Sequence, residues 1–110
     1  MKVREVIEKL ELEVITATHP GKEVRGGYSG DLLSNVMAKA GKGDLWLTIQ
    51  GHQNVVAVAL LTGVAAVIIV ENLEVEKEAI QKAEEKGVNL LRSKLSAYQL
   101  GGRLYQMGIR

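Results

Sequence analysis

The residues best suited to chemistry lie in a polar turn between two apolar segments. This turn carries Thr48, Gln50, His52 and Asn54. Open α/β sheets place ligands at the carboxyl ends of their strands, and the free N–H groups at the start of a helix suit an anion such as phosphate or carboxylate. We therefore predict a ligand site at this turn. The alternative is that Asn54 or Gln53 caps the helix and that His52 is a solvated turn residue.

A glycine-rich segment, Gly26-Gly27-Tyr28-Ser29-Gly30-Asp31, is the second candidate site. Glycines let a backbone approach a ligand closely, and the ring of Tyr28 can cover a ring of the ligand. Tyr28, Ser29 and Asp31 are therefore candidate ligand residues. The Asp31 carboxylate suits a helix start but repels an anion there. The alternative is a glycine-rich turn in which Ser29 or Asp31 is the N-cap of the next helix.

Other chemistries find little support in the sequence. Neither the phosphate-loop pattern Gly-x-x-x-x-Gly-Lys-Ser/Thr nor Gly-x-Gly-x-x-Gly occurs, and no serine has a Gly-x-Ser-x-Gly setting. His19, His52 and Asp31 lack metal-ligand spacing, and there is no cysteine. We therefore predict no catalytic residue, no metal and no cofactor.

Composition limits the partners and the compartment. The 110 residues are 46% apolar and 25% charged, and 14 basic against 13 acidic residues give a net charge of +1. No basic stripe is present, which argues against nucleic acid as a partner. The uncharged run Val55 to Val70 is shorter than the roughly 20 residues of a membrane span, and Gly63 interrupts it. The N-terminus lacks the apolar core of a signal peptide, so we expect a cytoplasmic protein without a membrane partner.

Strand-like and helix-like patterns alternate along the chain. Strands are expected over 12–17, around Val24, and over 45–49, 65–70 and 88–91, with helices over 3–10, 31–40, 54–61, 75–86 and from Ser96 onward. This order predicts a three-layer α/β/α fold with a mostly parallel sheet of four to five strands, covered on both faces. The length suits one domain, 1–110, in which 1–10 is an N-terminal helix.

One predicted helix is apolar on every side, whereas a surface helix keeps a polar face. Its apolar residues include Val55, Val56, Val58, Ala59 and Leu60. One side can pack on the sheet, but the other needs a cover, so we predict a homodimer with these residues near the interface. The alternative is that the N-terminal or the C-terminal helix folds over this one.

Several short motifs occur in a defined order. They are Gly26-Gly27-Tyr28 followed by Asp31-Leu32-Leu33-Ser34, Gly43-Asp44-Leu45-Trp46-Leu47-Thr48-Ile49, Asn54-Val55-Val56-Ala57-Val58-Ala59, and Gly87-Val88-Asn89-Leu90-Leu91. Together they resemble the DRTGG domain family over residues 22–108. The literal Asp-Arg-Thr-Gly-Gly string is missing, and Val24-Arg25-Gly26-Gly27 is the nearest string.

The resemblance implies a fold similar to the N-terminal domain of HPr kinase/phosphorylase. Domains of this family occur in phosphotransacetylases and beside CBS domains in pyrophosphatases, as regulatory or assembly modules that are often dimeric. We therefore expect a non-catalytic module that homodimerises and binds a small anionic metabolite or nucleotide. A pure interaction module for a partner enzyme is the alternative, and a small enzyme of unknown reaction is the least favoured one.

Overall fold

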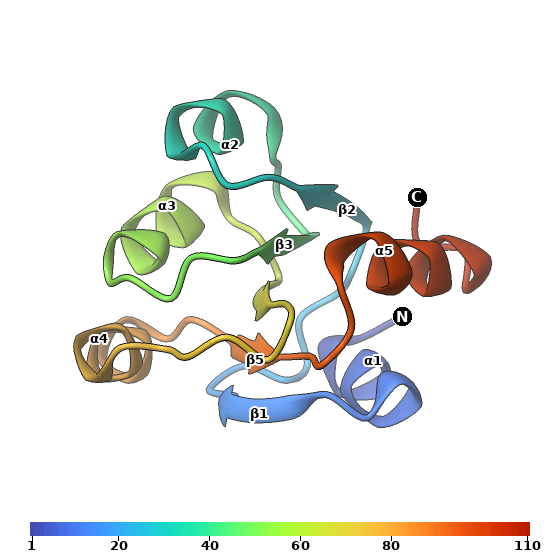
Figure 1. Cartoon of the computed structure of the whole chain (residues 1–110), viewed down its shortest axis with the longest axis horizontal. Helices are drawn as coiled ribbons and strands as arrows, with labels where there is room; N and C mark the ends of the chain where they lie inside the picture. Colours follow the sequence, from blue (N-terminus) through green and yellow to red (C-terminus); the bar gives the residue numbers. More distant parts are fainter.

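The computed structural model describes residues 1–110, whose strands form one sheet with helices packed against it (Figure 1). The helices are α1 (Val3–Leu10), α2 (Leu33–Lys39), α3 (Asn54–Thr62), α4 (Lys77–Lys86) and α5 (Ala97–Gln106). The strands are β1 (Glu13–Thr16), β2 (Gly26–Ser29), β3 (Asp44–Thr48), β4 (Ala66–Ile69) and β5 (Leu90–Arg92). Their order is β1-β5-β4-β3-β2, with β1 antiparallel to β5 and the other neighbours parallel. The predicted α/β class with a mostly parallel sheet is confirmed.

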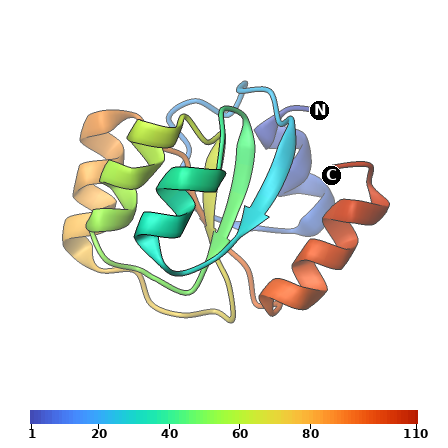
Figure 2. The same cartoon turned by 90° about the horizontal axis from the view of Figure 1, so that it is seen from above.

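Helices cover both faces of this sheet. Figures 1 and 2 show α2, α3 and α4 on one face and α1 and α5 on the other. Successive side chains of a strand point to opposite faces, so Trp46 and Val67 pack in the core beneath α2–α4, and Leu45 and Ile68 in the core beneath α1 and α5. The central strand β4 is buried along its whole length, which explains its uninterrupted apolar sequence.

Most of the apolar helix α3, except its last turn, is covered by its own chain. Val55, Val56, Val58 and Ala59 are buried in the core that α2, α3 and α4 share, and α2 and α4 flank α3 on either side. These four residues are covered within the subunit, without the second subunit or terminal helix that we expected as their cover, and a dimer interface at α3 stays a prediction. Of the predicted interface residues only Leu60 remains exposed, at 49% of its surface. None of the helices is long and apolar enough to span a bilayer.

Strand β2 lies where the sequence favoured a glycine-rich turn. It occupies Gly26–Ser29 and pairs with β3, whereas the short strand was expected around Val24. Glycine has a low strand propensity, which hides this strand from pattern analysis. Close packing explains the glycine at its start, because a Cβ on Gly26 would lie 3.0 Å from Asp44 Oδ1 and 3.3 Å from the Arg110 carbonyl oxygen.

Candidate functional site

The two polar segments singled out in the sequence meet at the carboxyl edge of the sheet. Asp31, in the loop after β2, accepts hydrogen bonds at Oδ1 from Thr48 Oγ1 and from the Ile49 N–H, both at 2.9 Å. The Gln50 side-chain amide donates to the Asp31 carbonyl oxygen. Parallel strands β2 and β3 end side by side, which brings these loops together. Asp31, Thr48 and Gln50 thus form one network, in which Thr48 is buried.

The Asp31 carboxylate therefore accepts hydrogen bonds from the neighbouring loop and does not cap a helix. The residue at the N-cap of α2 is Leu32, with no side-chain hydrogen bond to the helix. This corrects the expectation that Ser29 or Asp31 is the cap. Ser29 belongs to strand β2 and is exposed.

Tyr28 and Ser29 face different layers, as neighbours on a strand must. The ring of Tyr28 packs against the core beneath α2 and α3, and its hydroxyl accepts a 2.8 Å hydrogen bond from the Asn35 side chain. Ser29 lines an open hollow of about 970 Å³ along α5. The indole N–H of Trp46 donates to the Gly30 carbonyl at 2.9 Å and fixes the end of this segment. The glycine-rich segment is thus pinned to β3 and α2.

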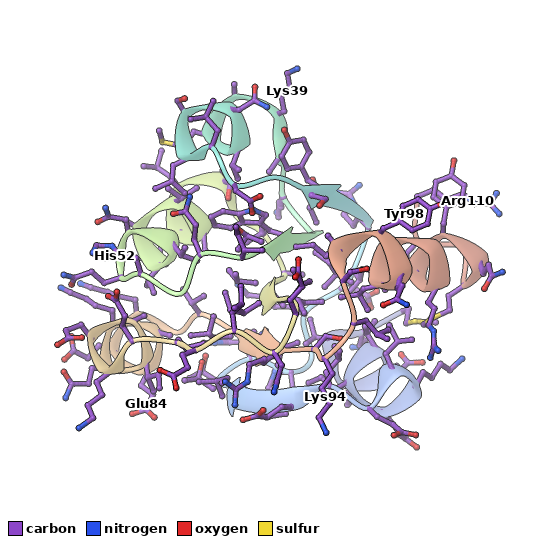
Figure 3. The ribbon with its side chains drawn as sticks, viewed as in Figure 1. Lys39, His52, Glu84, Lys94, Tyr98 and Arg110 are labelled. Atoms are coloured by element: carbon purple, nitrogen blue, oxygen red, sulfur yellow. The ribbon has the colours of Figure 1, made fainter.

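His52 lies just before α3, and its imidazole contacts Asn54 and Glu76. Its Nδ1 accepts a 3.1 Å hydrogen bond from the Asn54 N–H, and its Nε2 lies 3.9 Å from Glu76 Oε1. Gln53 makes no capping hydrogen bond, so the imidazole, rather than Gln53 or Asn54, satisfies this helix N–H. In Figure 3, His52 lies in the α2–α4 layer, away from Tyr98 on α5 and from Arg110, which follows α5.

The charge at this turn does not favour an anion. Asp31 and Glu76 contribute carboxylates, and the side chains of Thr48 and Gln50 already donate hydrogen bonds to Asp31. None of the larger cavities is lined by Thr48, Gln50 or His52. A ligand-binding role for this turn and for the glycine-rich segment stays a prediction. No group of three or more His, Asp or Glu side chains is placed to hold a metal ion.

The switch point of the sheet lies between β4 and β5, because α4 and α5 run to opposite faces there. Such a crevice is the usual ligand site of a parallel sheet. Here the chain closes it with backbone hydrogen bonds of 2.8 Å, from Glu71 N–H to the Leu95 carbonyl and from Asn72 N–H to the Ser93 carbonyl. Glu71 and Asn72 adopt left-handed φ angles of 60° and 54° to do so.

Next to the closed crevice is a cavity of about 310 Å³, called here the carboxyl-edge cavity. Lys9, Lys94 and Arg103 line it, together with Glu13 and Arg92, which form an ion pair at 2.9 Å. These residues come from α1, β1, β5, α5 and the loop between β5 and α5. Sequence reasoning missed this cavity, because its position depends on the order of the strands, which hydrophobic patterns do not reveal.

The fold and its edges define a small three-layer α/β module whose parallel strands end in short, internally bonded loops. The family model of the DRTGG domain matches residues 5–107. The chain therefore belongs to the DRTGG domain family, which confirms the resemblance seen in the sequence.

Two comparisons place the chain among known proteins. It is 29% identical to an HPr kinase/phosphorylase from Streptococcus uberis (strain ATCC BAA-854 / 0140J), over 93% of this chain and 38% of that protein. It is also similar in structure to the CBS and DRTGG domains of the regulatory region of Clostridium perfringens pyrophosphatase, crystallised with its activator diadenosine tetraphosphate. That match has a TM-score of 0.72 at 15% identity and covers 94% of this chain and 45% of the other. The chain thus spans less than half the length of either protein.

Proposed function

We propose that this chain is a regulatory module that binds a small anionic metabolite or nucleotide and has no catalytic activity of its own. The observation that carries the proposal is that the chain belongs to the DRTGG domain family. A domain of this family is part of the regulatory region of the clostridial pyrophosphatase, whose activator is a nucleotide. The likeness to HPr kinase/phosphorylase does not bring phosphoryl transfer with it. The match covers 38% of that protein, and the phosphate-loop pattern is missing from this sequence.

The proposed module also pairs with a second copy of itself. An exposed face of α5 supports this: Tyr98 is 91% exposed and Tyr105 is 59% exposed, one on either side of Gly101 and Gly102. A Cβ on either glycine would meet nothing within 4 Å, so packing inside the subunit does not require them. Large exposed aromatic side chains beside a flat helix surface suit a protein interface.

A pure interaction module for a partner enzyme is the second candidate. It is favoured by the lengths of the two matched proteins, in which the corresponding domain occupies 38% and 45% of the chain. In that case the domain would join or orient its partner without binding a small molecule.

Thermal unfolding separates the two candidates. The protein is heated with nucleotides, acyl phosphates, inorganic phosphate and divalent metals, each over a range of concentrations. A ligand that binds only the folded state stabilises it by about 2.7 kcal/mol at roughly 100 times its Kd, which is several degrees for a domain of this size. A dose-dependent rise with phosphorylated compounds supports the sensor. No shift with any compound supports the interaction module.

A further inference from the structure

A larger cavity than the carboxyl-edge cavity lies at the opposite end of the sheet. Its volume is about 740 Å³, within the usual range for small-molecule sites. Three segments form it: 22–25 before β2, 42–43 before β3, and the end of α3 with the residues that lead into β4. We call it the amino-edge groove; Lys22, Arg25, Lys42, Leu60 and Leu61 line it. In Figure 2 the strands run downward, so these connections lie along the upper edge of the sheet.

The groove gathers positive charge that the chain leaves unpaired. Lys22, Arg25 and Lys42 form no ion pair, and all three are exposed. Glu23 is the one carboxylate in the lining, and it is already engaged by the N-terminal ammonium at 3.5 Å and by Lys2 at 3.8 Å. The carbonyl end of α3 adds the equivalent of about half a negative charge. Three cations therefore outweigh the negative groups, and the groove attracts anions.

Backbone hydrogen bonds hold the three segments of the groove together. The N–H of Gly43 donates to the Gly63 carbonyl at 3.0 Å, and the Gly43 carbonyl accepts from the Arg25 N–H at 2.8 Å. Gly43 has a φ of +85°, and a Cβ there would lie 2.7 Å from Arg25 Cγ. The stem of Arg25 is therefore laid directly against Gly43. This contact anchors the root of the Arg25 side chain before any ligand arrives, which lowers the entropy lost on binding.

One wall of the groove is apolar and exposed. Leu61 exposes 77% of its surface and Leu60 49%, on the last turn of α3. Leucines left open beside unpaired cations suit a ligand that carries both an apolar ring and negative charge. A simple inorganic anion would use the cations and leave the leucines uncovered.

We propose that the amino-edge groove is the binding site for a nucleotide or a similar phosphorylated ring compound. Its phosphates pair with Arg25, Lys42 and Lys22, and its ring lies on Leu60 and Leu61. This inference rests on the proposed regulatory function and gives it a location different from the turn at Thr48 and His52.

The first test measures binding of ATP, adenosine and inorganic triphosphate by isothermal titration calorimetry at low ionic strength. We expect ATP to bind more tightly than either of its parts. Arg25→Glu and Lys42→Glu should each weaken ATP by about tenfold or more, the usual weight of one charged contact. Leu61→Ser should weaken ATP and leave triphosphate unchanged. Lys82→Glu, which makes the same charge change on the exposed side of α4, should have no effect.

A second measurement needs no variant. In a ¹⁵N–¹H correlation spectrum of the wild-type protein, ATP should shift the amide signals of Gly43 and Gly63, which border the groove. Binding of ATP that shifts Gly51 instead, or that is lost in Lys94→Glu or His52→Ala but kept in Arg25→Glu, overturns this location and leaves the regulatory proposal standing. If the wild-type protein binds neither ATP nor triphosphate, both the location and the anion-binding function fail.

Discussion

At the scale of single residues, Asn89 is the polar side chain on which the fold depends most. It is buried immediately before β5, accepts a 3.0 Å hydrogen bond from the His19 N–H, and donates to the carbonyls of His19 and Ala65 at 2.8 and 2.9 Å. Asn89→Ala removes all three hydrogen bonds and leaves the His19 N–H without its partner, whereas the His19 carbonyl keeps the 3.2 Å hydrogen bond from the Lys22 N–H. We expect this substitution to lower the free energy of unfolding by about 3 kcal/mol, measured by urea denaturation.

Asn54→Ala is the matched control, because Asn54 is exposed and its side chain is hydrogen-bonded to no other residue. It should stay within about 0.5 kcal/mol of the wild-type value. A loss below about 1 kcal/mol for Asn89→Ala would contradict the role assigned to its three hydrogen bonds.

Sequence reasoning reached part of the residue-scale picture. It selected Asp31, Thr48 and Gln50, and the structure joins them in one network because neighbouring parallel strands end at the same edge. It could not assign the Asp31 carboxylate to Thr48 and Ile49, since such hydrogen bonds depend on where two loops lie in space. For the same reason it passed over Arg25 and Lys42, which are far apart in the sequence and line one groove.

At the scale of elements, α5 carries a glycine pair that weakens it as an isolated helix. Gly101 and Gly102 lie in the helix interior, and glycine there costs about 0.5–1 kcal/mol relative to alanine. A Cβ at Gly102 would meet nothing within 4 Å. Gly102→Ala should therefore raise the free energy of unfolding by about that amount in dilute solution, measured by urea denaturation.

Gly43→Ala provides the opposite case in the same experiment. Gly43 has a φ of +85°, and its added Cβ would meet the Arg25 stem at 2.7 Å. This variant should be destabilised by about 1–2 kcal/mol. If Gly102→Ala and Gly43→Ala change the free energy of unfolding by the same amount, the low helix propensity of the glycine pair does not limit the stability of α5.

The elements were predictable where hydrophobic periodicity is strong. Helices α1, α4 and α5 and strand β4 follow their patterns closely. Strand β2 was not predicted at its correct position, because two of its four residues are glycine, which has a low strand propensity. Pairing with β3 stabilises this strand despite that low propensity. The position of the apolar helix α3 was predicted correctly, but the elements that cover it were not. Placing α2 and α4 beside α3 requires the strand order, which the sequence pattern does not reveal.

At the scale of the whole molecule, the α5 face that carries Tyr98 and Tyr105 contributes no residue to the amino-edge groove. Ligand binding at the amino-edge groove and pairing through α5 would therefore use different surfaces of one small domain. The accessible surface of the subunit is 6062 Å², and a typical interface covers about 800 Å² of each partner. A dimer through α5 would leave most of the surface, including the amino-edge groove, open to a ligand.

The proposed pairing predicts how the mass in solution responds to one substitution on this face. Tyr98 points away from the body of the protein in Figure 3 and makes no hydrogen bond in the subunit, so Tyr98→Asp should leave the fold intact. If α5 forms the dimer, light scattering should show the mass fall from dimer to monomer, because the partner would have to bury an unpaired carboxylate. Leu61→Asp makes the same kind of change on α3 and should leave the dimer unaltered. A wild-type protein that stays monomeric at high micromolar concentration, or a dimer broken by Leu61→Asp alone, would rule out pairing through α5.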